Sequence, residues 1–488
     1  MSTGTNSEGR ARYQVIGLVL GPAIAITMLM FEPPATLGVA GWYTAAFGVW
    51  MAIWWATEAL PIAVTAFLPM VLFPLFDVRS MTDTVVPYSD KVIYLFLGGF
   101  VVAFAMQRWN LHRRIALTVL QFAGGNGRSL IGGFMLASAL ISMWVMNTST
   151  TMMLLPIGVS VIAVIHNSVK SLDDKSRDDF QCALLLGIAY ASTIGGIATL
   201  VGTAPNAVLA GFMEDTYGIQ IAFANWMLVG LPVTALMLPL SWIALTRLVF
   251  KVDFRTSNEG RAELRRMKDE MGPITTPEKR VGIVFLAMAV LWITRPLLNK
   301  LPALSGLEDA MIAMAGAITL FVLPSGDRDD PLLLRWEYAE RLPWGVLVLF
   351  GGGLALAKAV ADTGLAAWIG ESLHVVATMP PFLLVMLIAA LIIFLTELTS
   401  NVATTTTFLP VVGAIAIEAG MNPLLLTVPV TLAASCAFML PVATPPNAIV
   451  FGSGLLTIPK MIRAGIALNI IGIVVVSLAA EFLAPKFL

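Results

Sequence analysis

The chain has 488 residues, of which 58% are hydrophobic and only 12% are charged. Soluble globular proteins carry roughly 25% charged residues, so this chain lacks the charge needed to cover a soluble protein of its length. The net charge of −1 provides no basic excess for nucleic acid, and two cysteines and three scattered histidines exclude a disulfide framework and a zinc cluster. The composition predicts an all-α polytopic membrane protein.

The N-terminal region, residues 1–40, contains a first apolar run from Val15 to Phe31. This run is long enough to cross a bilayer, which takes roughly 17–25 helical residues. We interpret it as a retained N-terminal helix rather than a signal peptide, because no convincing small-residue cleavage site follows it.

Apolar runs recur along the whole chain and predict about eleven transmembrane helices. The predicted spans are residues 15–31, 42–56, 60–76, 92–107, 181–213, 226–250, 281–295, 308–323, 344–360, 425–456 and 462–483. The only sizeable polar segment is 251–280, which has a helix-forming stretch at 261–271. We interpret 251–280 as a cytoplasmic connector between two halves, residues 41–250 and 281–488.

Five groups of basic residues set the predicted orientation, because cytoplasmic loops carry an excess of lysine and arginine. With a cytoplasmic N-terminus and eleven spans, all five groups lie on the cytoplasmic side of an inner (plasma) membrane, and the C-terminus lies outside. The groups are Arg108, Arg113, Arg114 and Arg128; Lys170, Lys175 and Arg177; the basic residues of 247–280; Arg335 and Arg341; and Lys460 and Arg463.

Two apolar segments do not fit an ordinary span. Residues 130–165 would form a helix of roughly 54 Å, far longer than a bilayer core of about 30 Å, and their centre, 147–151, is a run of five polar residues. Residues 382–418 repeat this pattern, with mostly polar residues at 396–401 and threonines at 404–407. Each segment alone fits equally well as a re-entrant helical hairpin, buried in protein or facing an aqueous cavity, or as two short spans joined at the surface.

An internal repeat favours the two re-entrant hairpins. Residues 95–100 resemble 349–354, and residues 147–156 resemble 401–410, with the same offset of 254 positions (349 minus 95, and 401 minus 147). Five predicted spans separate the copies, and an odd number places them in opposite orientations. Inverted repeats with helices broken at matching positions are typical of transporters whose substrate site lies between the repeats.

A third repeated element interrupts two of the predicted helices. Residues 201–207 resemble residues 442–448, with an offset of 241 positions (447 minus 206), and both copies contain proline. Proline removes a backbone donor and clashes with the preceding turn, which frees carbonyl groups. A freed carbonyl can coordinate Na⁺, and the N-terminus of the following half-helix can face an anion. A kink used only for packing is the alternative, but two kinks at matched positions favour a site.

The repeated elements are rich in Asn, Thr and Ser and contain almost no charge. Their amide and hydroxyl oxygens, with freed carbonyls, are hard ligands that suit Na⁺. An anion held by neutral donors needs compensating cations, which links anion binding to Na⁺ binding. Glu397 is either a cation ligand or a buried carboxylate that supports the hairpin, and we favour the second role. Lys358 and Asp362, four residues apart, are expected to form an interfacial ion pair.

These motifs resemble those of the divalent anion:sodium symporter family, which includes bacterial dicarboxylate carriers and animal sodium/citrate carriers. The resemblance extends from about Gly41 onward and rests on residues 142–150, 397–406 and 440–451, of which 441–447 are the most specific. It implies an elevator-type fold in which each protomer of a homodimer has a scaffold domain and a mobile transport domain.

The same resemblance implies roles for individual residues. Each hairpin tip of the family carries a Ser-Asn-Thr motif that meets sodium and a substrate carboxylate. Here the motifs read Met146-Asn147-Thr148 and Ser400-Asn401-Val402. The implied sodium ligands are Ser142, Asn147 and Gly202 in the first half, and Thr396, Ser400, Asn401 and Ala443 in the second. The implied substrate-binding residues are Asn147, Thr148, Thr203, Asn401, Val402, Thr444 and Pro445.

Two departures from the motif bear on specificity. Met146 removes a hydroxyl from the first cation site, and a thioether is a poor Na⁺ ligand. Val402, which resembles the sodium/citrate branch, removes a donor to a carboxylate.

Together these features predict a secondary active transporter, rather than an enzyme, that couples uptake of a C4-dicarboxylate (succinate, fumarate or malate) or citrate to Na⁺. The sequence has no zinc-protease motif and no embedded serine-hydrolase elbow. The alternative is a Na⁺-independent anion exchanger or a sulfate-type carrier on the same scaffold. The expected partners are the carboxylate anion, sodium ions, the lipid bilayer and a second copy of the chain.

Overall fold

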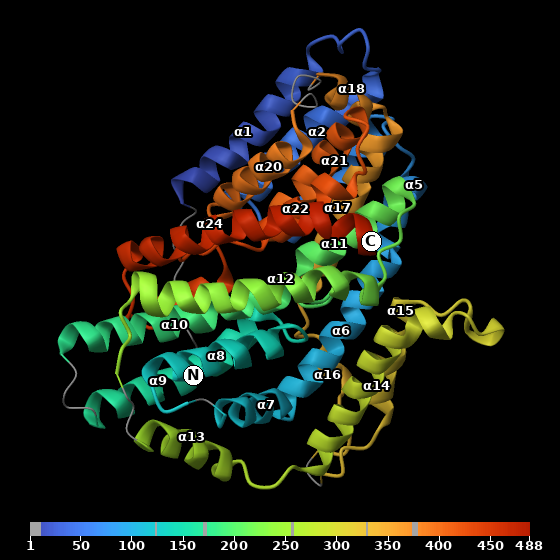
Figure 1. Cartoon of the computed structure of the whole chain (residues 1–488). Coiled ribbons are helices and arrows are strands. Elements are labelled where there is room, and N and C mark those ends of the chain that lie inside the picture. Colours follow the sequence, from blue (N-terminus) through green and yellow to red (C-terminus); the bar gives the residue numbers. More distant parts are fainter. Residues whose placement is uncertain (1–10, 123, 169–172, 255–257, 328–329, 373–378) are drawn as a thin grey trace.

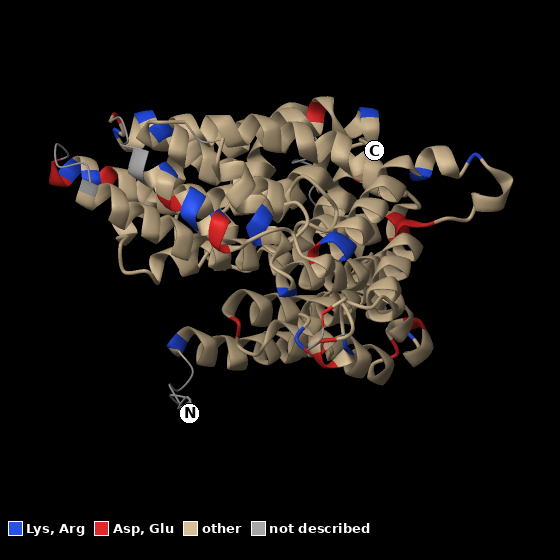
Figure 2. Cartoon of the chain, turned by 90° about the horizontal axis from the view of Figure 1, so that it is seen from below, with Lys and Arg blue, Asp and Glu red and all other residues tan. Residues whose placement is uncertain are grey.

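A computed structural model describes residues 11–122, 124–168, 173–254, 258–327, 330–372 and 379–488, and these residues fold into packed helices (Figure 1). Among them, eight helices are long and apolar enough to cross a membrane, and five further apolar helices have 10–17 residues. Long stretches of helix carry no charged residue (Figure 2). The prediction of an all-α polytopic membrane protein is confirmed, whereas the count of eleven spans stays a prediction.

The part of the chain up to the end of α13 contains the N-terminal helix, the first half and most of the connector. Its helices are α1 (Arg12–Leu29), α2 (Val39–Thr57), α3 (Ile62–Thr65), α4 (Leu68–Leu75), α5 (Met81–Val85), η1 (Val86–Ser89), α6 (Lys91–Arg108), α7 (Leu111–Leu120), α8 (Gly127–Ser142), α9 (Asn147–Ser168), α10 (Asp174–Gly196), α11 (Ala204–Tyr217), α12 (Phe223–Ile243), η2 (Ala244–Val249) and α13 (Asn258–Glu270).

The second half repeats much of this order. Its helices are α14 (Thr276–Leu298), η3 (Pro302–Leu304), α15 (Asp309–Val322), α16 (Trp336–Ala339), α17 (Trp344–Asp362), α18 (Leu365–Ser372), α20 (Pro381–Thr396), α21 (Asn401–Glu418), α22 (Leu424–Ala434), α23 (Pro445–Phe451), α24 (Ile458–Phe482) and α25 (Ala484–Phe487).

The predicted span 60–76 is wrong as a single helix, because it divides into the short helices α3 and α4. Pro61 precedes the first of these helices and Pro69 lies in the first turn of the second. A proline inside a helix removes one backbone hydrogen bond, and its ring clashes with the preceding turn. The carbonyl oxygen of Ala66, between the two helices, accepts a hydrogen bond from the Tyr88 hydroxyl instead.

The repeat predicted from the motifs is present in the packing. Phe96 on α6 and Phe350 on α17 occupy equivalent positions, and their rings contact each other edge to face with centroids 5.1 Å apart. Gly98 and Gly352 are also equivalent. A Cβ atom added to Gly98 would lie 2.5 Å from the backbone of Ala313, and one added to Gly352 would lie 2.3 Å from the Ala66 carbonyl oxygen. The glycine-rich motifs therefore allow both α6 and α17 to pack closely against a neighbouring backbone.

Each of the two segments consists of two helices joined by a short turn. The polar residues 147–151, expected at the centre of the first hairpin, form the start of α9 instead, and the turn before them reads Met-Trp-Val-Met. Residues 143–146 join α8 to α9, and residues 397–400 join α20 to α21. The first arms pack against helices of their own half, α8 against α10 and α20 against α22. The second arms contact both halves, α9 packing against α10 and α23, and α21 against α22 and α11. Each hairpin therefore contacts elements of both halves of the chain.

The connector is firmly attached to the first half. Its helix α13 packs against α7 and α9, and the Ser160 hydroxyl donates to the Glu263 carboxylate (3.1 Å). A hydrogen bond from Arg266 lowers the pKa of Glu263. The helix predicted at 261–271 is confirmed, although residues 276–280 of the predicted connector already belong to α14.

Candidate functional site

The first hairpin turn brings two of the predicted sodium ligands together. Ser142 is the last residue of α8 and Asn147 is the first residue of α9, and the Ser142 hydroxyl donates to Asn147 Oδ1 over 2.6 Å. A Cβ atom added to Gly196 would lie 2.7 Å from Asn147 Oδ1 and 3.0 Å from the Gly202 carbonyl oxygen. Hydroxyl, amide and freed carbonyl oxygens therefore converge where α8, α9 and the end of α10 meet.

The second hairpin turn repeats this geometry at equivalent positions. Thr396 ends α20 and Asn401 begins α21, and the Thr396 hydroxyl contacts Asn401 Oδ1 at 2.9 Å. The same hydroxyl also contacts the Ala434 carbonyl oxygen (3.1 Å), at the end of α22. A hydroxyl, an amide oxygen and the end of a broken helix therefore meet in this half as well.

In the breaks between α10 and α11 and between α22 and α23, an asparagine side chain donates hydrogen bonds to the carbonyl groups that the break leaves free. Asn206 Nδ2 lies 2.8–3.3 Å from the carbonyl oxygens of residues 196, 197 and 199. Asn447, its equivalent, donates to the carbonyl oxygens of residues 437 (3.4 Å) and 440 (3.0 Å), which are equivalent to 196 and 199. In both asparagines, Oδ1 is buried without a hydrogen-bond partner. The sequence motif contained both asparagines, and the offset of 241 positions was the signal that could have assigned them this role.

The predicted substrate residues lie at helix N-termini. Asn147 and Asn401 begin α9 and α21. Thr203 and Thr444 precede α11 and α23 with matching extended backbone, φ −144° and ψ 144° for Thr203 and φ −142° and ψ 150° for Thr444. The first N–H groups of a helix have no partner within it and carry partial positive charge, so helix N-termini of this kind favour anions.

Burial differs between the two predicted sets of residues. Four predicted sodium ligands, Ser142, Gly202, Thr396 and Ala443, are buried, whereas Ser400 is half-buried. The predicted substrate residues are mostly half-buried, with Pro445 exposed and Thr444 buried. The half-buried ones are Asn147, Thr148, Thr203, Asn401 and Val402. The two tip asparagines, which belong to both sets, therefore lie between an enclosed oxygen-rich interior and a more open surface.

The donor set fits Na⁺ by its chemistry. Its side-chain and backbone oxygens are neutral and hard, as oxygen-coordinated cations require. The described residues contain no group of three or more His, Cys, Asp or Glu side chains able to hold a metal ion. Sodium binding at these positions therefore depends on hydroxyl, amide and carbonyl oxygens, and the assignment of each ligand stays a prediction.

The charged residues singled out in the sequence, Glu397, Lys358 and Asp362, have partners in the structure. The Glu397 carboxylate accepts hydrogen bonds from backbone amides of residues 438–440, in agreement with the supporting role predicted for it. The expected pair of Lys358 and Asp362 is present at 3.8 Å, and Asp362 also contacts Arg79 at 3.2 Å.

Comparisons with known proteins extend this description. The family described as "Sodium:sulfate symporter transmembrane region" matches residues 12–484. The sodium-dependent dicarboxylate transporter SdcS of Staphylococcus saprophyticus is 43% identical over 479 residues, covering 97% of this chain and 92% of that protein. SdcS of Staphylococcus aureus (strain USA300) is 41% identical over 475 residues, covering 97% and 91%.

A solved structure shares the fold. The crystal structure of the Alcanivorax borkumensis YdaH transporter matches with a TM-score of 0.61 and 12% identity, covering 91% of this chain and 99% of that chain. The family match and the two relatives each span nearly the whole chain and include both hairpins and both broken helices. The chain therefore belongs to the sodium:sulfate symporter family, the divalent anion:sodium symporters that its motifs resemble.

Proposed function

We propose that this protein is a secondary active transporter that couples the uptake of a C4-dicarboxylate to Na⁺. The observation that carries the proposal is the pair of matched turns, in which a tip asparagine meets a buried hydroxyl, Ser142 in the first half and Thr396 in the second. The relatives named sodium-dependent dicarboxylate transporters, 41–43% identical over nearly the whole chain, support the same substrate and ion.

The electrostatics of the site explain why the two solutes move together. A dicarboxylate carries two negative charges, and the tips offer neutral donors and helix N-termini. Sodium ions held behind Asn147 and Asn401 supply the missing positive charge, so each solute raises the affinity for the other. Uptake then needs no covalent step, because ligand binding shifts the balance between outward-facing and inward-facing states.

The proposal includes the two-domain elevator and the homodimer that the family resemblance implies. The crossed packing supports a single moving unit, because α9 and α21 each contact a half-helix of the other repeat. In this scheme the hairpins and broken helices move together past α6 and α17.

The proposed orientation has a cytoplasmic N-terminus and an outside C-terminus. Contacts between the basic groups support it. Asp330 pairs with both Arg108 and Arg335, and the Lys460 ammonium lies 2.6 Å from Asp178, close to Arg177 in the chain. With the pair of Arg128 and Asp253 (3.4 Å), these contacts link the first group to the third and the fourth, and the second group to the fifth. Such links are expected if the groups face one side of the membrane. Lys170 lies outside the described residues.

Transport into proteoliposomes tests the proposal. Labelled succinate is offered with Na⁺ or with choline in the external buffer, at equal ionic strength. The proposal predicts accumulation with an inward Na⁺ gradient and background uptake in choline. Equal uptake in the two buffers would contradict sodium coupling.

A second function is favoured by one residue. Met146 places a thioether where the family motif has a hydroxyl, and loss of that ligand would suit a Na⁺-independent exchanger or a sulfate-type carrier. Succinate-loaded vesicles distinguish the exchanger, because only an exchanger shows stimulated uptake from internal succinate in choline. Inhibition of uptake by sulfate, but not by malate, identifies the sulfate-type carrier.

A further inference from the structure

The two halves attach their hairpin turns to their broken helices by different chemistry. In the first half, the Thr199 hydroxyl donates to the Met143 carbonyl oxygen (2.5 Å) and accepts from the Gly202 amide (3.1 Å). The positions equivalent to Met143 and Thr199 are Glu397 (143 plus 254) and Leu440 (199 plus 241). The first half therefore uses a neutral hydroxyl from the break, and the second half uses a carboxylate from the hairpin.

The Glu397 carboxylate is bound entirely by donors. Oε1 accepts from the amides of Phe438 (2.7 Å) and Met439 (2.9 Å), and Oε2 accepts from those of Met439 (3.0 Å) and Leu440 (3.0 Å). The side-chain amide of Asn469, on α24, donates to Oε1 over 2.8 Å. The residue is only 3% exposed. A deprotonated carboxylate accepts hydrogen bonds and donates none, so this environment suits a fixed negative charge.

This carboxylate joins the two segments from which the second cation site is built. Glu397 directly follows Thr396 on the hairpin, and its backbone partners lie shortly before Ala443 in the break. Thr396 and Ala443 are ligands proposed for the same ion. Because Glu397 already holds their segments together, less conformational entropy is lost when the ion binds. The negative charge of the carboxylate also attracts a cation, and this attraction is stronger in the protein interior, where the dielectric constant is low.

We propose that Glu397 is a positioning residue for the second-half cation site, and that this site binds Na⁺ more tightly than the first-half site. The inference rests on the proposed function. The first-half site has Met143 in place of the carboxylate and Met146 in place of a motif hydroxyl. The second-half site consequently fills at lower Na⁺ concentration.

Sodium titration of the purified full-length protein tests this inference. The melting temperature is followed without substrate as Na⁺ replaces choline at constant ionic strength. In Glu397→Gln, an amide group faces backbone N–H donors, and we expect the half-saturating Na⁺ concentration to rise at least tenfold. Glu397→Asp keeps the charge on a shorter side chain and is expected to recover part of this affinity. Met143→Leu, at the equivalent position, is the matched control and is expected to stay within twofold of the wild type.

Transport separates positioning from a general structural role. In proteoliposomes at saturating Na⁺, Glu397→Gln is expected to keep its maximal rate and its KM for succinate within about threefold of the wild type. If Glu397 had only a general structural role, the variant would transport succinate more slowly at every Na⁺ concentration. That result would overturn the inference.

The remaining outcomes are also decisive. An unchanged half-saturating Na⁺ concentration in folded Glu397→Gln overturns the inference while leaving the proposed function in place. If Glu397→Gln gives no cooperative melting transition, Asn469→Ala decides, because it removes a single donor. A two- to fivefold rise in that concentration supports the inference, and no change overturns it. A wild-type protein that shows no response to Na⁺ contradicts the proposed function itself.

Discussion

Single side chains define the candidate site, and the most informative are the two tip asparagines. Each has its Oδ1 within hydrogen-bonding distance of a buried hydroxyl five residues earlier, over 2.6 Å for Asn147 and 2.9 Å for Asn401. An amide can offer an oxygen to a cation and a donor to a carboxylate at the same time. This double use explains how uncharged tips can serve both solutes.

Asn401→Ala is expected to reduce succinate uptake about 100-fold. A hydrogen bond to a charged group contributes about 1.5–3 kcal/mol, and this residue is proposed to contact both solutes. Uptake in proteoliposomes, at matched protein content and melting temperature, measures the effect. Asn167→Ala, at an exposed position near the other end of α9, is the control. Uptake by Asn401→Ala at the wild-type level would remove this residue from the site.

Met146→Ser restores the hydroxyl of the family motif. We expect the Na⁺ concentration that half-saturates uptake to fall by roughly 3- to 10-fold, about 0.7–1.4 kcal/mol, or the Na⁺ dependence to become steeper. The exposed Met152 provides the matched control, Met152→Ser. If the two variants behave alike, the first cation site does not use the side chain at position 146.

At the residue scale, the sequence predicted two interrupted apolar segments, but it placed the centre of the first at the polar run 147–151. That run forms the start of α9, and the turn itself is the apolar stretch 143–146. The sequence did not reveal Thr199 or Asn469 as partners of the turns, because their contacts join segments 56 and 72 residues apart. Contacts of this range follow from tertiary packing and leave no local pattern in the sequence.

The helices themselves carry the repeat. The sequence predicted α6 as residues 92–107 and α17 as residues 344–360, within two residues of their ends, because both are long and uniformly apolar. It predicted one helix, 60–76, where the structure has the two short helices α3 and α4, because hydropathy alone does not register the effect of closely spaced prolines. Glycines within α6 and α17 were noted as a motif, and their role in close helix packing became visible only in three dimensions.

Gly352→Ala is expected to destabilise the protein. The added Cβ would lie 2.3 Å from the Ala66 carbonyl oxygen, a backbone atom, and overpacking of this kind costs about 1–3 kcal/mol. The melting temperature in detergent should fall by several degrees. Gly48→Ala is the control, because its Cβ would lie 3.6 Å from the nearest side-chain atom. Equal melting temperatures for the two variants would contradict the packing argument.

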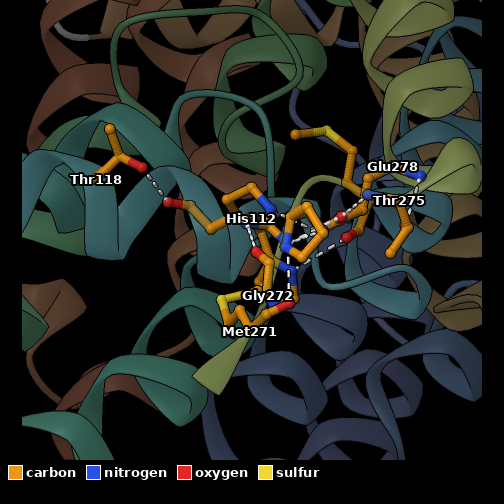
Figure 3. A network of polar contacts seen from close by, with 9 residues as sticks. His112, Thr118, Met271, Gly272, Thr275 and Glu278 are labelled. Carbon is orange, nitrogen blue, oxygen red and sulfur yellow. Dashed lines mark hydrogen bonds and ion pairs between the residues drawn. The ribbon is translucent and has the colours of Figure 1, made fainter. Parts of the chain in front are cut away.

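On the scale of the whole molecule, the connector fixes how the two halves meet. The Arg114 guanidinium on α7 donates to the carbonyl oxygens of residues 271–273, after α13, and to the Glu278 carboxylate at the start of α14. Figure 3 shows Met271, Gly272, Thr275 and Glu278 within this network. Glu278 is only 2% exposed. An ion pair between the half-buried Arg114 and the buried Glu278 carboxylate therefore joins α7 to the start of α14, in a region that the sequence marked only as a polar segment.

Arg114→Met is expected to lower the free energy of unfolding by about 3–5 kcal/mol, because it leaves a buried carboxylate unpaired. The double variant Arg114→Met with Glu278→Gln should recover part of the loss, since no uncompensated charge remains. Melting temperatures measured side by side check both statements. A single variant as stable as the wild type would show that the network does not stabilise the junction.

Binding of succinate to the purified protein tests the central claim most directly, namely that cations at the two tips make a dianion tolerable. The melting temperature is measured with succinate in Na⁺ and in choline, for the wild type and for Asn147→Ala and Asn401→Ala. The account predicts stabilisation by succinate in Na⁺ only, and its loss in each variant. Equal stabilisation by succinate in choline, or full retention in both variants, would contradict it.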